Sequence, residues 1–127
     1  MDYLKGLNPA QRDAVLQMNG PVMIIAGAGS GKTRVITMRV AHLVASGVDA
    51  FNILVLTFTN KAAKEMRERI MHVVGDEAKN IWMGTFHSVF AKILRVEADK
   101  IGYPNNFTIY DTDDSKSVIR AILKEMN

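Results

Sequence analysis

The segment that most constrains this chain is VMIIAGAGSGKTR, residues 22–34, in which an apolar run enters a glycine-rich loop. Residues 22–26 predict a buried β-strand, and the pattern from Gly31 predicts a helix that ends near Gly47. A glycine-rich loop between a buried strand and a helix start is the setting of a phosphate-binding loop. The segment therefore favours an α/β fold built around a phosphate site.

The residue types in this loop suit the binding of a nucleoside triphosphate. Gly27, Gly29 and Gly31 allow tight or left-handed turns, so that several backbone N–H groups point into one concavity. The helix that follows adds unpaired amides and its positive end. Lys32 brings a full charge to the transferred phosphate, and the Thr33 hydroxyl suits a phosphate-bound Mg²⁺. We predict both of these residues to be catalytic, with Thr33 reaching the metal through the phosphate.

The loop departs from the pattern G-x-x-x-x-G-K-[ST] at one position, where Ala26 replaces the first glycine. This position closes the predicted strand, and a methyl group is easily tolerated there. The alternative interpretation is a glycine-rich turn with a chance Lys-Thr pair, which the flanking strand and helix patterns disfavour.

The rest of the chain alternates between apolar runs and helical patterns. Strands are predicted at residues 53–57, 81–84 and 107–111, and helices start at Asn8, near Asn60, at Thr85 and near Asp113. Asn8 is the expected cap of the first helix, with Gln11 as its capping-box partner. Continuously apolar strands between helices indicate a largely parallel sheet flanked by helices.

Composition removes several classes of function. The chain has no cysteine, which excludes disulfides and thiolate metal sites and fits a cytoplasmic protein. Its first residues lack the apolar core of a signal peptide, and its apolar runs are too short to span a membrane. The net charge of +3 permits a nucleic-acid partner without deciding for one.

Four segments occur in an order that is specific to one family. They are LNPAQRDAV (7–15), AGAGSGKTR (26–34), LTFTNKAAKEMRERI (56–70) and GTFHS (84–88). In this respect the chain resembles UvrD/Rep/PcrA-like superfamily 1 DNA helicases. The resemblance implies an ATP- and Mg²⁺-dependent motor that moves 3′ to 5′ along single-stranded DNA and separates duplex at single/double-strand junctions. It also implies that these residues begin the first of two RecA-like motor domains.

The resemblance assigns two further residues to the nucleotide. Gln11 corresponds to a glutamine that reads the adenine edge, and Arg34 to an arginine packed on the adenine ring. Helix capping alone remains open for Gln11, and a solvated position on the first helical turn remains open for Arg34. The predicted nucleotide site is then Gln11, Ala26, Gly27, Ala28, Gly29, Ser30, Gly31, Lys32, Thr33 and Arg34.

Two polar and aromatic segments follow predicted strands, where open α/β sheets place their ligands. Phe58 suits a base-stacking platform, and His87 can stack on a base or bond to it. Without the family, a core role is the stronger interpretation for Phe58, and Phe86 is at least as compatible with one; a lone surface histidine such as His87 usually does nothing. The predicted DNA contacts are Thr57, Phe58, Thr59, Asn60, Thr85, Phe86 and His87, with Ser88 as a further phosphate ligand. The charged residues from Lys61 to Arg69 mostly predict a solvated helix face.

Hydrolysis also needs an acidic pair at the end of a buried strand. VVGDE (73–77) contains an Asp-Glu pair after two apolar residues. Its valines, however, complete a helical stripe, and Gly75 suits a helix C-cap. FTIYD (107–111) alternates like an edge strand and continues with Thr112. We therefore reject both segments.

The resemblance places the acidic motif, the arginine fingers and the second motor domain beyond residue 127. Residues 1–112 are then the N-terminal part of the motor domain, and residues 113–127 lead into an inserted helical subdomain. A fragment of this kind is expected to be inactive alone and to have some tendency to self-associate.

Two other function classes remain open from the residues. A stand-alone P-loop kinase would need an acceptor site and an arginine-rich lid, which nothing after Gly84 supplies. A module that only binds single strands would not need Lys32 and Thr33. Measurement of ATP binding with and without a hydroxyl acceptor, and with and without single-stranded DNA, separates the three.

Overall fold

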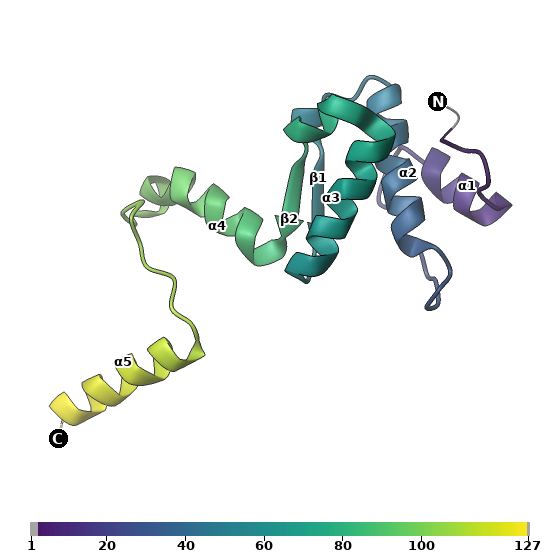
Figure 1. The fold of residues 1–127 in the computed structure, drawn as a ribbon. Helices are drawn as coiled ribbons and strands as arrows, with labels where there is room; N and C mark the ends of the chain where they lie inside the picture. The colour runs from purple at the N-terminus through teal and green to yellow at the C-terminus, as the bar shows by residue number, and fades with distance from the viewer. Residues whose placement is uncertain (1–2, 127) are drawn as a thin grey trace. The chain divides into compact units, whose positions relative to one another are not determined.

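The computed structural model describes residues 3–126, which form two compact units, one running to Phe90 and one starting at Ala91 (Figure 1). In chain order, the first unit contains α1 (Pro9–Leu16), α2 (Lys32–Ala45), the 3-10 helix η1 (Ala50–Asn52), β1 (Leu54–Thr57), α3 (Asn60–Val74), the 3-10 helix η2 (Gly75–Asn80) and β2 (Trp82–Thr85). Helix α4 (Phe86–Glu97) begins in this unit and continues into the second, which adds η3 (Ala98–Ile101) and α5 (Thr112–Glu125).

The two strands lie parallel and in register, with Leu54 opposite Trp82 and Thr57 opposite Thr85. Helix α3 connects them and packs across one face of the pair (Figure 1). Parallel neighbours require a crossover of this kind, so the predicted α/β alternation is confirmed for this part of the chain. The buried core contains Val40, Ala50, Ile53, Val55, Met66, Ile70, Ala78, Ile81 and Met83.

The N-terminal helix starts as its sequence predicts. Asn8 is the N-cap of α1, its side chain accepts from the backbone of Gln11, and the Gln11 side chain accepts from the backbone of Asn8. Arg39 of α2 donates from Nη1 to the carbonyl of Ala14 at 2.6 Å and so ties α1 to α2. This connection holds α1 beside the helix that begins at the predicted phosphate loop.

Two predicted strands do not form among the described residues. Residues 22–26 and 107–111 lie outside every strand, and Met23 and Ile25 are 84% and 88% exposed. The prediction of a buried strand before the phosphate loop, and of a further strand at 107–111, was therefore wrong. A strand is held by hydrogen bonds to a neighbour, and within residues 3–126 the only strands that pair are β1 and β2. Apolar residues that lack a neighbouring strand do not form a β-strand, whatever their intrinsic strand propensity.

The second unit is largely helical. Arg95 lies 4.8 Å from the centre of the Phe107 ring and donates to the carbonyls of Asn105 and Phe107. Asp111 caps α5 by accepting from the backbone of Asp113 and Asp114, and no residue of α5 is buried. Within residues 3–126, none of the helices is long and apolar enough to cross a membrane.

Candidate functional site

The predicted phosphate loop leads directly into α2, whose first residue is Lys32. Gly29 and Gly31 have φ angles of 74° and 83°, which confirms that these positions need the conformational freedom of glycine. A Cβ atom added at Gly27 or Gly29 would meet nothing within 4 Å. The backbone of the loop therefore borders open space in which an anion can approach it.

Lys32 is folded back onto this loop. Its Nζ atom donates to the carbonyl of Ala26 at 3.0 Å and to the carbonyl of Gly27 at 2.8 Å. The Gly27 carbonyl also accepts from the Ser30 hydroxyl at 2.6 Å and from the Ser30 N–H at 3.3 Å. These bonds hold the ammonium group at the start of α2, where the helix amides already favour negative charge. Thr33 follows on the first turn and is half-buried.

Gln11 links α1 to the loop through its side-chain amide. Its Oε1 atom accepts from the N–H of Asn8 at 3.1 Å, and its Nε2 atom donates to the carbonyl of Ser30 at 2.9 Å. The predicted capping role is thus confirmed. The sequence did not predict the hydrogen bond to Ser30, because a capping box gives no indication of the partner of the Gln11 Nε2 atom. The reading of adenine by Gln11 stays a prediction.

Arg34 lies exposed on the first turn of α2, as expected from its position. Its Nη2 atom donates to the carbonyl of Lys5 at 3.2 Å, and a Cβ atom at Gly6 would come within 2.9 Å of the same nitrogen. Arg34 therefore holds the turn that precedes α1. Its packing on an adenine ring stays a prediction.

A half-open cavity of about 340 Å³ lies between α1 and the loop. It brings together residues that the sequence placed in the nucleotide site, namely Gln11, Ala26, Gly27, Ser30 and Lys32. The apolar side chains of Ile24 and Ile25 line it as well. A cavity with apolar walls and a few convergent polar groups is the usual form of a small-molecule site.

A second candidate surface lies where β1 and β2 end. Because Thr57 and Thr85 are opposite each other in the register, the residues that follow them leave the sheet at the same edge. Phe58 is 88% exposed and Phe86 is 39% exposed, so a buried core role for Phe58 was rightly set aside. Asn60 and His87 are also exposed, on the first turns of α3 and α4.

The hydroxyl groups at this edge are largely occupied by helix starts. Thr59 caps α3 by accepting from the N–H of Ala62 at 3.1 Å. Thr85 and Ser88 bond to each other reciprocally, since the Ser88 hydroxyl accepts from the Thr85 N–H at 3.1 Å and the Thr85 hydroxyl accepts from the Ser88 N–H at 3.2 Å. Both pairs fix the geometry of the surface, and phosphate contacts by these hydroxyls stay a prediction.

Gly84 is a residue of this surface whose role the sequence did not reveal. A Cβ atom there would lie 2.8 Å from the Ser88 hydroxyl oxygen and 2.9 Å from Cγ2 of Val89. Only glycine therefore allows the first turn of α4 to pack so closely against the end of β2. The signal in the sequence was the glycine itself, placed at a strand end and before a helix.

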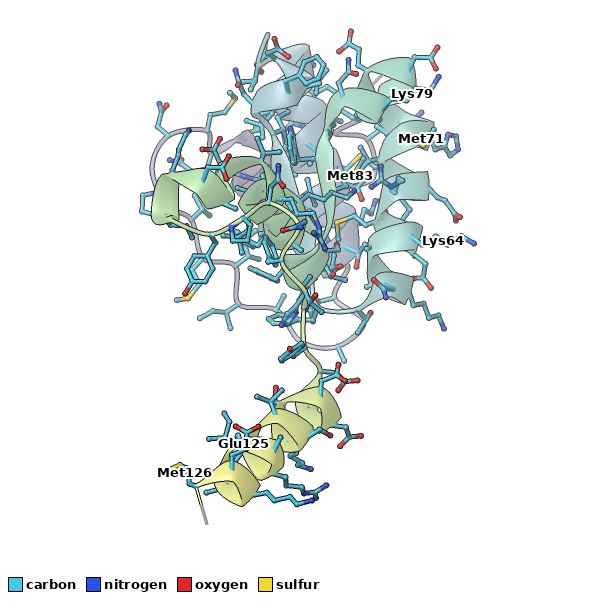
Figure 2. All side chains as sticks on the ribbon, turned by 90° about the vertical axis from the view of Figure 1, so that its left-hand side faces the viewer. Lys64, Met71, Lys79, Met83, Glu125 and Met126 are labelled. Atoms are coloured by element: carbon cyan, nitrogen blue, oxygen red, sulfur yellow. The ribbon has the colours of Figure 1, made fainter. Side chains whose placement is uncertain are left out.

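The charged face of α3 is solvated, with one exception. Lys64 points outward from α3, away from the sheet (Figure 2). Arg67 instead donates from Nη2 to the carbonyl of Met83 at 2.6 Å. Along a parallel strand, the backbone N–H and C=O groups of successive residues point to opposite edges. The N–H of Trp82 donates to the carbonyl of Ile53 on the β1 side, so the carbonyl of Met83 points to the other edge of β2. Arg67 therefore covers the free edge of β2, a role that the charge pattern did not reveal.

The two acidic segments that imitate a hydrolysis motif have other roles. Gly75 has a φ of 83° and forms the C-cap of α3, as predicted, while Asp76 pairs with Lys79 at 2.6 Å. Asp111 caps α5. Neither segment presents a pair of carboxylates at a strand end. Among residues 3–126, no three His, Asp or Glu side chains gather in a way that suits a metal ion.

The chain matches a known protein family over most of its length. The model of the UvrD/REP helicase N-terminal domain matches residues 7–127. This range includes the predicted phosphate loop and both segments at the carboxyl edge of the strands. The match is thus to the same residues that the geometry brings together.

Curated relatives show the same similarity. The ATP-dependent DNA helicase PcrA of Staphylococcus epidermidis (strain RP62A) is 55% identical over 125 residues, which is 98% of this chain and 17% of that protein. The ATP-dependent DNA helicases PcrA of Bacillus subtilis (strain 168) and Staphylococcus aureus (strain Mu50) are each 54% identical over the same shares of the two chains. This chain therefore spans about a sixth of the length of these relatives.

Proposed function

The chain belongs to the UvrD/REP helicase family, and we propose that it forms the nucleotide-binding beginning of an ATP-dependent DNA helicase. The observation that carries this proposal is the in-register pairing of β1 and β2. It places the start of the segment TFTN (residues 57–60) beside the start of the segment TFHS (residues 85–88). In the intact protein, ATP would drive movement along single-stranded DNA, 3′ to 5′ by resemblance, with strand separation at duplex junctions. Residues 1–112 are assigned to the first motor domain and residues 113–127 to the start of an inserted helical subdomain.

The residues around the phosphate loop fit a triphosphate with Mg²⁺. Open space lies over Gly27 and Gly29, and the ammonium group of Lys32 is already held at the helix start. Bound ATP supplies the free energy of hydrolysis, and Mg²⁺ neutralises part of the phosphate charge. Lys32 would contact the phosphates, the Thr33 hydroxyl would hold the metal, and Gln11 and Arg34 would contact the base. A Cβ atom at Gly31 would lie 2.9 Å from Nε2 of Gln11 and 4.0 Å from Cβ of Arg34, so both residues lie beside the start of α2, which supports their assignment to one ligand.

The carboxyl edge of the two strands is the proposed DNA surface. Single-stranded nucleic acid binds where exposed aromatic rings accept bases and polar groups accept phosphates. Phe58 supplies the most exposed ring at this edge, and His87 and Asn60 lie exposed beside the strand ends. Thr57 belongs to the same strand end and donates from its hydroxyl to the carbonyl of Thr59 at 3.2 Å.

Substitution of the two exposed rings tests the DNA surface. Phe58→Ala and His87→Ala in the full-length protein should each weaken single-strand binding by about 1–3 kcal/mol where a base stack is lost. Nucleotide affinity without DNA should stay near that of the parent, because neither side chain lines the cavity beside Gln11 and Lys32. Fluorescence anisotropy with a labelled oligonucleotide measures the first effect. Parental DNA affinity in both variants would remove these residues from the proposed surface.

The chain of residues 1–127 by itself should bind ATP weakly and show no DNA-stimulated hydrolysis. The carboxylates that imitate a hydrolysis motif are engaged elsewhere, Asp76 with Lys79 and Asp111 with the start of α5. Phosphate release from the purified chain, with and without single-stranded DNA, measures this directly. DNA-stimulated release that disappears in Lys32→Ala would show that these residues hold a complete active site. Light scattering of the same sample tests the proposed self-association.

A further inference from the structure

An aromatic pair joins the two segments of the proposed DNA surface. The ring centres of Phe58 and Phe86 lie 5.2 Å apart, with the ring planes tilted by 34°. This distance falls within the range of about 4.5–7 Å in which aromatic pairs attract each other. The two rings differ in exposure, since Phe58 is 88% exposed and Phe86 only 39%. One ring therefore faces solvent almost completely, and the other lies partly covered at its side.

The two rings also differ in how firmly the chain holds them. Phe86 is the first residue of α4, and the reciprocal bonds of Thr85 and Ser88 fix that helix start on both sides of it. Val89, one turn further, is buried at 3% exposure. Phe58 instead lies in the bend between β1 and α3. An exposed ring in a bend has few contacts that limit its rotamers.

We propose that Phe86 is a positioning residue that holds the ring of Phe58 in the orientation in which a base stacks on it. The inference rests on the proposed function, since it concerns the same DNA surface. Binding is weakened when an exposed side chain must be ordered at the moment of contact. Phe86 reduces this entropic cost of binding, because it already restricts the Phe58 ring before DNA binds. The surface is then a single platform built from two segments, with the base contact made by Phe58.

A double-mutant cycle in the full-length protein tests this coupling. Single-strand affinity is measured without nucleotide for the parent, Phe58→Ala, Phe86→Ala and the double variant. Phe58→Ala should weaken binding roughly 5- to 160-fold, the range expected for one lost base stack. Phe86→Ala should weaken binding severalfold in the parent and cause no further loss when Phe58 is already alanine. Losses that multiply in the double variant would overturn the proposal, because Phe86 would then contact DNA independently.

Conservative variants separate positioning from a merely structural role. Phe86→Tyr keeps the ring and should restore the single-strand affinity of the parent, whereas Phe86→Leu keeps an apolar side chain and should not. Both should retain the melting temperature and the nucleotide affinity of the parent. Equal DNA affinity of Phe86→Leu and the parent would overturn the positioning role. If Phe58→Ala itself binds DNA like the parent, Phe58 makes no base contact and the proposed DNA surface loses its most exposed ring, a result that differs from a failure of the coupling alone.

Discussion

Replacement of Lys32 by alanine should abolish ATP turnover and duplex unwinding by the full-length protein while its fold and its single-strand affinity are kept. The Lys32 ammonium bonds to the carbonyls of Ala26 and Gly27 on an exposed loop, so its loss removes little that stabilises the core. It also removes the side-chain charge that we propose to contact the transferred phosphate. Loss of one such preorganised group slows turnover by about 100- to 1000-fold or more. Phosphate release in the presence of single-stranded DNA measures the effect.

Two surface lysines provide matched controls for this experiment. Lys79 pairs with Asp76 on the exposed 3-10 helix η2, and exposed pairs of this kind contribute about 0–1 kcal/mol. Lys64 points into solvent from α3 (Figure 2). Lys79→Ala and Lys64→Ala remove the same charge and should turn over ATP like the parent. Parental turnover in Lys32→Ala, or equal losses in all three variants, would contradict the role assigned to the phosphate loop.

Helix boundaries were predictable here because their signals are local. Asn8 and Gln11 form their capping box within one turn of chain, and Gly75 ends α3 through its own backbone conformation. The two strands at 53–57 and 81–84 were also predicted within a residue of β1 and β2. The helix caps depend on residues that are close in sequence, whereas β1 and β2 form because each has the other as its parallel partner.

The strand expected at 22–26 depends instead on a partner that is distant in the chain. Its apolar composition reports a preference for burial, and it says nothing about which strand lies beside it. Within the described residues that partner does not occur, and Ile25 is left 88% exposed. The hydrophobic pattern therefore predicted a strand at residues 22–26, but it could not show whether a neighbouring strand is present to pair with it.

The contacts between segments of the candidate site were equally beyond a linear pattern. Gln11 and Ser30 were both assigned to the nucleotide site, but the bond between them joins residues 19 positions apart. Phe58 and Phe86 were each predicted as DNA contacts, and their pairing became visible only with the register of β1 and β2. The motifs thus select residues for the candidate site, and the strand register shows which of them lie together.

Gly84→Ala should destabilise the protein and weaken its binding to single-stranded DNA. The added methyl group would lie 2.8 Å from the Ser88 hydroxyl oxygen and 2.9 Å from Val89 Cγ2, closer than real Cβ contacts allow. The side chains of Ser88 and Val89 must then move, and because both belong to the first turns of α4, we expect the start of this helix to shift away from β2. Overpacking of this kind lowers the free energy of unfolding by about 1–3 kcal/mol. Because α4 begins with Phe86 and His87, the same shift should disturb the proposed DNA surface while nucleotide affinity is kept.

Gly27→Ala is the matched control for the effect at Gly84. Neither glycine has a positive φ, so neither substitution forces a strained backbone. A methyl group at Gly27 meets nothing within 4 Å, and the free energy of unfolding should therefore equal that of the parent. Urea unfolding of both variants isolates close packing as the cause, and single-strand binding shows whether that packing serves the DNA surface. If Gly84→Ala is as stable as Gly27→Ala and binds DNA like the parent, the contact between α4 and the end of β2 does not organise this surface.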